Sequence, residues 1–274
     1  MKRFEDNYFD LLKHVQATGE ARDSRVGTTF SVFGASIEIP DLTIGAFPLL
    51  TTRKMAITGV LGELAAFIRG ADDLATFKEF GCNYWDFNAA QWMPNTDVPV
   101  EQQKVGRIYG VQWRDWDGMY DQLAALIQGI ERDPTGRRHI LTAWNPSELP
   151  AMCLPPCHIM SQFYVSKGKS LDCLVYMRSV DLCLGLPSDV VLYAMLLLLV
   201  AKRTGYMPGV LKFAFGDTHI YANHLKPLQE QLARQLRPPP TFTLAAESTL
   251  FAFLPKDLAI ENYEPHERIT YELN

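Results

Sequence analysis

Long apolar runs and paired cysteines are both scarce in this sequence of 274 residues. The longest apolar run, Val190 to Ala201, is far shorter than the roughly 20 residues that a helix needs to span a bilayer. The opening residues, MKRFEDNYFDLLKHV, are charged and lack the apolar core of a signal peptide. The cysteines are odd in number and irregularly spaced: Cys82, Cys153, Cys157, Cys173 and Cys183. We therefore expect a cytoplasmic protein with reduced thiols and no membrane partner.

Charge of one sign is not in large excess either. The formal net charge is -5, which gives no reason to expect a nucleic-acid or membrane-surface partner. Hydrophobic residues at 47% and charged residues at 21% fit a globular protein with a sizeable core. Any anion-binding site must therefore come from arginines that the fold gathers locally.

Helix and strand patterns alternate along the chain, and nothing resembles a linker. Apolar spacing predicts helices over 5–17, 59–70, 119–134 and 223–236, and a buried helix from Val190 onward. Alternation predicts a strand pair over 28–39 around Gly34, strands over 138–144, 158–166, 171–179 and 210–221, and short strands after 237. Residues 95–106 are predicted to form a surface loop. The pattern predicts one α+β domain over residues 1–274, with a mixed or antiparallel sheet packed against helices.

Cys157 is a candidate nucleophile in the segment CLPPCHIMSQFYV, at the start of a predicted strand. Two preceding prolines fix the approach of the chain, and a thiol needs cationic neighbours or backbone amides to ionise near neutral pH. By itself, a lone cysteine is more often a buried structural residue. A metal site built from Cys153, Cys157 and His158 is disfavoured, because the motif lacks a second ligand pair.

Short motifs along the whole chain follow the order found in one enzyme family. They are SRVGTTFSVFG, FPLLTTRK, GELAAFIRG, YWD, GRIYGVQWR, GRRHILTAWNPSEL, LPPCH, QFYV, RSVDLCLGLP and GDTHIYANH. The combination of LPPCH with RSVD and HIYANH is highly specific. The chain resembles the thymidylate synthase family nearly from end to end. The resemblance implies that family's single-domain fold and a homodimer formed sheet to sheet.

The resemblance also implies a reaction. Cys157 would add to C6 of a pyrimidine nucleotide, and 5,10-methylenetetrahydrofolate would supply a one-carbon unit to C5, with no metal. Glu63 matches a general acid-base glutamate that works through ordered water. Tyr109 and His219 match accessory groups at the nucleophile and the ring.

Binding roles follow from the same resemblance. The 5′-phosphate would be held by Arg25, Arg178 and Ser179 of one subunit and by Arg137 and Arg138 of the dimer partner. The sugar would contact His219 and Tyr221, and the folate would contact Trp85, Asp181, Leu184 and Gly185. Arg178 would also lower the pKa of the Cys157 thiol. Taken alone, the pair Arg137-Arg138 would fit an ordinary solvated face equally well.

The most informative departure from the family is Asp189, where thymidylate synthases have an asparagine that contacts the uracil edge. Cytosine presents an amino donor at position 4 and an acceptor at N3, the reverse of uracil. A carboxyl group can accept from the amino group and, if protonated, donate to N3. Asp189 is therefore expected to contribute to catalysis and to select cytosine. On local sequence alone, Pro187-Ser188-Asp189 also fits a helix start at which Ser188 or Asp189 acts as the cap.

Two further departures concern water. Ser188 replaces a family phenylalanine, and the segment ending Glu272-Leu273-Asn274 is more polar than the apolar family closure. Both changes are expected to admit water, which would give a 5-hydroxymethyl product and tetrahydrofolate in place of methylation. We therefore predict a dCMP 5-hydroxymethylase. The alternatives are a CMP 5-hydroxymethylase, a methylase acting on dUMP or dCMP, and a catalytically silent nucleic-acid-binding member.

Overall fold

The structure, a computed structural model, describes residues 2–24, 26–93, 99 and 103–272. A seven-stranded sheet has the order β1-β2-β7-β6-β5-β4, with β3 also beside β7. Its strands are β1 (Glu20–Ser24), β2 (Gly27–Phe33), β3 (Ser36–Ile39), β4 (Ile140–Thr142), β5 (His158–Val165), β6 (Ser170–Asp181) and β7 (Met207–Tyr221). β6 and β7 are parallel and the other neighbours are antiparallel. The predicted α+β fold with a mixed sheet is confirmed.

The two strands predicted around Gly34 form, but they do not pair with each other. β2 and β3 lie one after the other along the same edge of β7, Phe33 opposite Asp217 and Ser36 opposite Ala214. Gly34 lies between them with φ of +86°, a conformation that favours glycine. The two strands therefore form one interrupted neighbour of β7, divided by a glycine kink.

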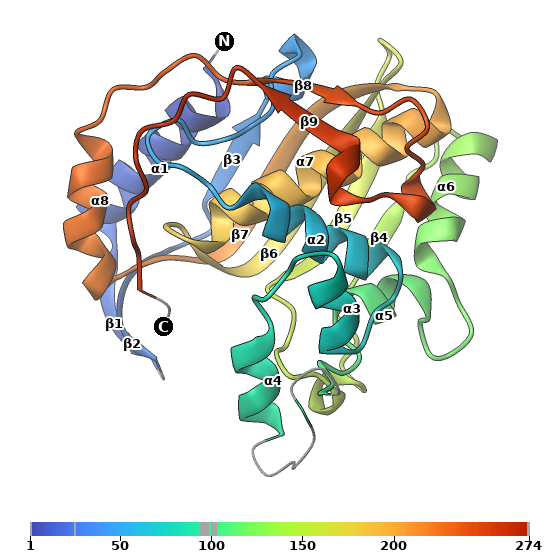
Figure 1. Cartoon of the computed structure of the whole chain (residues 1–274), viewed down its shortest axis with the longest axis horizontal. Helices are drawn as coiled ribbons and strands as arrows, with labels where there is room; N and C mark the ends of the chain where they lie inside the picture. The colour runs from blue at the N-terminus through green and yellow to red at the C-terminus, as the bar shows by residue number, and fades with distance from the viewer. Residues whose placement is uncertain (1, 25, 94–98, 100–102, 273–274) are drawn as a thin grey trace.

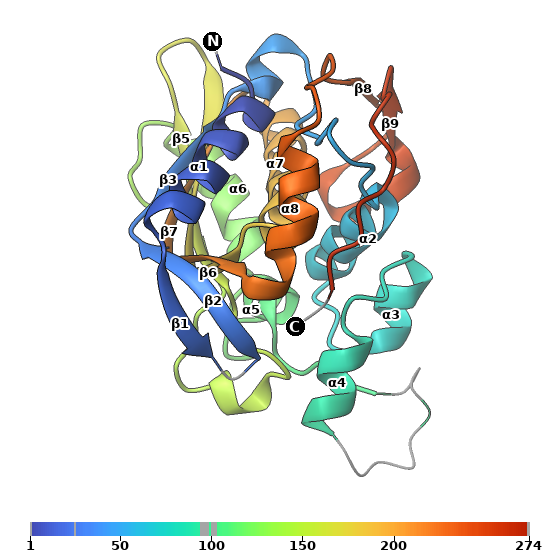
Figure 2. The same ribbon diagram turned by 90° about the vertical axis from the view of Figure 1, so that its left-hand side faces the viewer.

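The long helix α7 (Gly185–Thr204) lies along one face of the sheet and is packed in turn against α2 (Ile57–Ile68) (Figures 1 and 2). Among the described residues, α7 alone is long and apolar enough to cross a membrane, but 78% of that stretch is buried inside the fold. It is the core helix that the sequence predicted.

The start of α7 differs from the prediction. The helix begins at Gly185, so Ser188 and Asp189 lie inside its first turns and neither is the cap. The Asp181 carboxylate instead accepts hydrogen bonds from the backbone N–H groups of Cys183 and Leu184, at 2.8 and 3.3 Å. These bonds satisfy backbone donors just before the helix, so the chain needs no cap at Ser188. The side chain of Ser188 turns back and donates to the Leu184 carbonyl oxygen.

The other predicted helices are present with shifted ends, because end residues fray and caps are local. They are α1 (Phe4–Thr18), α6 (Gln122–Arg132) and α8 (Leu225–Leu232). Three short helices were not predicted: α3 (Leu74–Glu79), α4 (Asp86–Trp92) and α5 (Tyr109–Arg114). They are too brief to show a helical period. The edge strand β1 was not predicted either, because its exposed polar residues show no apolar alternation. The predicted loop 95–106 falls mostly outside the described residues.

The opposite face of the sheet is exposed in the single chain. Ile140 on β4, Tyr164 on β5 and Leu174 on β6 are 40%, 61% and 42% exposed. Their register places Ile140 beside Gln162, and Gln162 beside Leu174. In Figure 2 the sheet is seen on the left, with α7, α8 and α2 on its right. After α8, β8 (Thr241–Leu244) and β9 (Leu258–Glu261) form a two-stranded sheet. The residues that follow it, 262–272, are the tail, which returns past α8 (Figure 1).

Candidate active site

The predicted nucleophile, Cys157, directly precedes β5 and is held from two sides. Its backbone N–H donates to the Tyr109 hydroxyl at 2.7 Å. The Arg178 guanidinium lies 3.9 Å from the Cys157 Sγ atom and donates to the carbonyl oxygens of Pro155 and Pro156. The two prolines thus do more than stiffen the chain: their carbonyl groups position the arginine beside the sulfur.

The thiol is not activated in the way that the sequence suggested. Burial raises the pKa of Cys157; Arg178 and the Tyr109 hydrogen bond lower it, and nearby Asp189 raises it. The expectation that Arg178 lowers the pKa is correct in direction, but burial outweighs it and the resultant pKa is raised. The thiol therefore rests protonated, and the predicted role as nucleophile would require it to lose its proton.

His158 is a site residue that sequence reasoning left aside except as a weak metal ligand. Its ring stacks on Tyr109 with centroids 4.0 Å apart, and its Nδ1 atom lies 2.8 Å from the Tyr193 hydroxyl. Its Nε2 atom lies 3.7 Å from Asp189 Oδ1. Burial lowers the pKa of His158 to about 3, so the ring is neutral and offers Asp189 no positive charge. Its position directly after the nucleophile was the available signal.

Asp189 lies in the second turn of α7, beside His158 and close enough to Cys157 to raise the pKa of its thiol. Burial raises its pKa well above the ordinary value, and the neighbouring carboxyl groups of Glu63 and Asp181 raise it further. Like charges gathered in a low-dielectric site cannot all be ionised. The site therefore favours the protonated form of Asp189, which has one donor and one acceptor to present.

Glu63 projects from α2 and is paired with Trp85. The Trp85 indole N–H donates to Glu63 Oε1 at 2.8 Å. Burial raises the pKa of Glu63 to about 7, with the Trp85 hydrogen bond acting in the opposite direction. Such a carboxyl group can both take and give a proton near neutral pH. Trp85 itself is only 6% exposed, so the structure gives it a role in holding Glu63; its folate contact stays a prediction.

Replacing Glu63 by glutamine is expected to raise stability while it lowers activity. A folded-state pKa of about 7, against an ordinary 4.5, disfavours folding above pH 4.5, and the full cost is reached above pH 7. Glutamine removes that cost and still accepts the Trp85 N–H. We expect Glu63→Gln to raise the free energy of unfolding by about 1–3 kcal/mol near pH 8.5 and by much less near pH 5. Urea denaturation at both pH values measures the difference.

A matched control is Glu79→Gln, because Glu79 is exposed at the end of α3. That change is expected to leave the pH dependence of unfolding as it is. Equal stabilisation by Glu63→Gln at both pH values would contradict the raised pKa.

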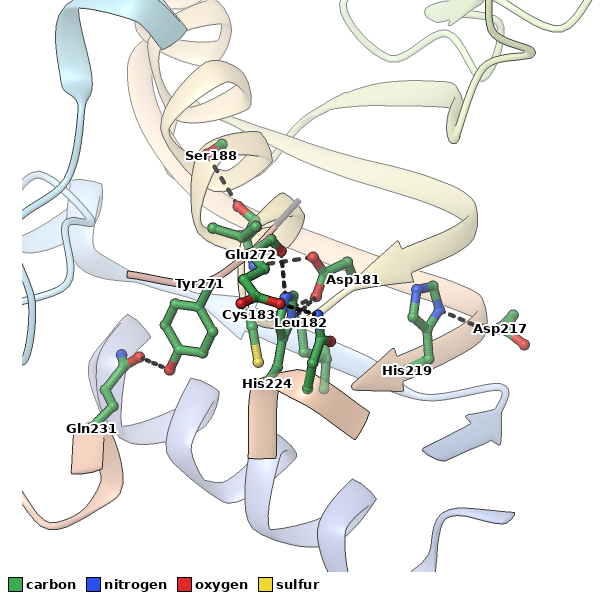
Figure 3. A network of polar contacts seen from close by, with 12 residues as sticks. Asp181, Leu182, Cys183, Ser188, Asp217, His219, His224, Gln231, Tyr271 and Glu272 are labelled. Atoms are coloured by element: carbon green, nitrogen blue, oxygen red, sulfur yellow. Dashed lines mark hydrogen bonds and ion pairs between the residues drawn. The ribbon is translucent and has the colours of Figure 1, made fainter. Parts of the chain in front are cut away.

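His219 and Tyr221, the predicted sugar contacts, lie next to each other on β7 with ring centroids 5.0 Å apart. Asp217 completes the group: its carboxylate lies 2.7 Å from His219 Nδ1 and accepts from the Ser31 hydroxyl (Figure 3). Sequence reasoning missed Asp217, although strand alternation places 217, 219 and 221 on one side of β7. Asp217 fixes the ring orientation, which leaves Nε2 as the His219 atom for a ligand.

Asp181, Cys183 and His224 offer ligand atoms within 4.8 Å of one another, the one such group among the residues that the structure describes. Their positions have another explanation in the polar network of Figure 3. His224 joins Asp181 to the backbone carbonyl of Glu272, and Arg53 donates to the Cys183 carbonyl oxygen. The absence of a metal remains a prediction.

Gly185 lies between Asp181 and Asp189. A side chain there would place its Cβ atom 3.7 Å from the Asp181 Cβ and 3.8 Å from Asp189 Oδ2. Leu184 and Gly185 are half-buried, and their folate contact stays a prediction.

The predicted phosphate residues are only partly brought together. Arg178 and Ser179 lie near the end of β6, and the Arg178 guanidinium contacts the Cys157 sulfur. Arg137 and Arg138 are exposed just before β4, away from the Cys157 contacts described above. Arg25 lies outside the described residues. A separation of Arg137 and Arg138 from Cys157 of the same chain is what we would expect if the pair binds phosphate in a partner subunit.

Comparison with known proteins gives a match to the thymidylate synthase family over residues 6–274. The chain belongs to the thymidylate synthase family. Members of the thymidylate synthase family are folate-dependent one-carbon transferases that act at C5 of a pyrimidine nucleotide, with methylenetetrahydrofolate as co-substrate. The thymidylate synthase family generally forms dimers.

Proposed function

We propose that this protein is a dCMP 5-hydroxymethylase. In this reaction dCMP, methylenetetrahydrofolate and water give 5-hydroxymethyl-dCMP and tetrahydrofolate. The observation that carries the proposal is the Asp189 carboxyl group, whose burial near Glu63 and Asp181 favours the protonated form, at the position where the family has asparagine. The whole chain would act as one catalytic domain.

A neutral acid suits cytosine better than uracil. Its carbonyl oxygen accepts from the 4-amino group, and its hydroxyl donates to N3. As the Cys157 sulfur forms a bond to C6, electron density moves through the ring onto N3, and Asp189 can pass its proton there. Uracil N3 already carries a proton, and its O4 is a far weaker base than cytosine N3. The shared proton therefore stabilises the cytosine adduct more than the uracil adduct.

The remaining groups have roles consistent with this chemistry. Cys157 is the nucleophile, positioned by Tyr109 and Arg178. With a pKa of about 7, Glu63 can take the proton that C5 loses and activate water. The bound folate supplies the one-carbon unit that C5 receives. Asp181, Leu184 and Gly185 would hold its pterin ring, and Trp85 would lie beside it.

The choice of hydroxymethylation rests on water access. After transfer, the ring carries an exocyclic methylene carbon at C5. Addition of water to that carbon gives a hydroxymethyl group, whereas hydride reduction gives a methyl group and dihydrofolate. Ser188 removes a large apolar side chain from this region and directs its hydroxyl back to Leu184. The smaller, polar residue favours water at the methylene carbon.

We also propose a homodimer joined through the exposed face of the sheet. Ile140, Tyr164 and Leu174 give that face an apolar centre. In such a dimer Arg137 and Arg138 would complete the partner's phosphate site with its Arg25, Arg178 and Ser179. The described cysteines are all free, which suits a cytoplasmic location.

Product analysis tests the proposal. The purified protein would be incubated with methylenetetrahydrofolate and dCMP, CMP or dUMP, and the nucleotide products identified by mass spectrometry. We expect a 5-hydroxymethyl product from dCMP, with no growth of dihydrofolate absorbance. A methylated product together with dihydrofolate would establish the methylase alternative. Faster turnover of CMP than dCMP would make the substrate a ribonucleotide. Failure to release tritium from C5 of any of the three would indicate a silent member.

A further inference from the structure

The docked tail meets the active site at one buried histidine, His224. His224 is fully buried in the short turn between β7 and α8. Its Nε2 atom lies 2.7 Å from the Glu272 carbonyl oxygen, and its Nδ1 atom lies 3.8 Å from Asp181 Oδ1 (Figure 3). Nε2 therefore lies at hydrogen-bond distance from an acceptor, and Nδ1 lies at ion-pair distance from a carboxylate. A neutral imidazole has a single N–H, so only the doubly protonated ring has a donor for each side.

Further contacts fix the tail around this ring. The Tyr271 hydroxyl donates to Gln231 at 2.7 Å, and Gln231 in turn donates to Thr52. The Tyr271 ring packs edge-on to His224, with centroids 5.2 Å apart. Asn223 donates to the Glu272 carboxylate at 3.1 Å. The tail is thus also held next to His224 by hydrogen bonds that do not involve the His224 ring.

The charged and titratable groups around His224 come from four segments. Asp181 at the end of β6 is the nearest carboxylate, with Cys183 just after it; the tail contributes Tyr271 and Glu272. Tyr221 on β7 packs against the opposite side of the ring. Arg53 lies over Tyr271 and donates to the Cys183 carbonyl. Burial lowers the pKa of His224, but Asp181 and Glu272 together outweigh burial and leave the pKa raised.

We propose that His224 is a positioning residue whose imidazolium joins the tail to Asp181, so that docking of the tail binds a proton. Asp181 also holds the backbone at the start of α7, which carries Gly185, Ser188 and Asp189. The same proton therefore couples the tail to the residues that would face folate and base. The folate part of this inference rests on the proposed function; the proton-linked docking does not.

The sign of the effect follows from the raised pKa. Its stabilisation of the docked tail is complete below the ordinary pKa of 6.5 and is lost as the pH rises through the raised folded value. We expect the tail to open more often in mildly alkaline solution. The KM for methylenetetrahydrofolate should rise over the same pH range, while kcat at saturating folate changes less.

Hydrogen exchange of the peptide that ends at Glu272 tests the docking directly. After correction for the intrinsic pH dependence of exchange, we expect its protection to fall about tenfold across the raised pKa of His224. His224→Gln should abolish the step, because a glutamine amide can still donate but does not titrate. His266→Gln is the matched control: His266 also lies near a backbone carbonyl, that of Gln235, and its replacement should leave the step in place.

Nitrogen NMR of the His224 ring measures the protonation of its two nitrogens directly. It uses the unmodified protein, so the result does not depend on how a variant folds. Two protonated nitrogens at pH 6.5 are expected, and a single proton on the ring would overturn the inference. A step that persists in His224→Gln would overturn it too. Failure of the proposed function is a separate result, since it would change the nucleotide products and leave both of these measurements intact.

Discussion

Asp189→Asn is expected to shift the base preference from cytosine toward uracil by roughly 10²-fold or more in the ratio of kcat/KM values. An amide can still donate and accept, so both bases can bind. It has no acidic proton to pass to cytosine N3 when Cys157 adds to C6, so turnover of dCMP falls. Uracil needs only a donor at O4 and an acceptor at N3–H, which the amide provides.

Steady-state kinetics with dCMP and dUMP measures this ratio. The matched control is Asp172→Asn on β6, where the carboxylate accepts only from the Val210 backbone N–H among the described hydrogen bonds. That variant should keep the parent ratio. An unchanged ratio in Asp189→Asn would remove Asp189 from base selection and the cytosine assignment with it.

Cys157→Ser is expected to lower kcat by about 10⁴-fold or more, because a serine hydroxyl ionises far less readily than a thiol. Nucleotide affinity should change little, since Arg178 keeps its bonds to the two proline carbonyls. The direct measurement uses a nucleotide with fluorine at C5, which cannot leave as a proton does. The unmodified protein should form a covalent adduct with it that survives denaturation.

Cys153→Ser provides the comparison, since Cys153 is a half-buried thiol four residues earlier. It should retain both turnover and the adduct. A stable adduct in Cys157→Ser, or its loss in Cys153→Ser, would assign the nucleophile to a different residue.

The difference between Glu63 and Trp85 illustrates what sequence reasoning could reach. The resemblance of the motif around Glu63 predicted an acid-base residue, a role that needs a pKa near neutrality. That pKa depends on the surroundings of the carboxyl group. Burial raises it to about 7, and the indole N–H of Trp85, at the start of α4, donates to the carboxylate. No local pattern joins residue 63 to residue 85, so the sequence assigned Trp85 to the folate alone.

The sequence by itself determined the fold class and the order of the main elements, and it predicted the nucleophile and the one substitution on which the substrate proposal depends. Motif order and apolar periodicity carry that information because they depend on residue types and spacing. Only the tertiary structure decided that Asp189 lies inside α7 rather than capping it, that burial raises the pKa of its carboxyl group, and that His224 lies between the tail and Asp181. Protonation and docking depend on which groups converge in a low-dielectric interior, and that convergence exists only once distant segments have folded together.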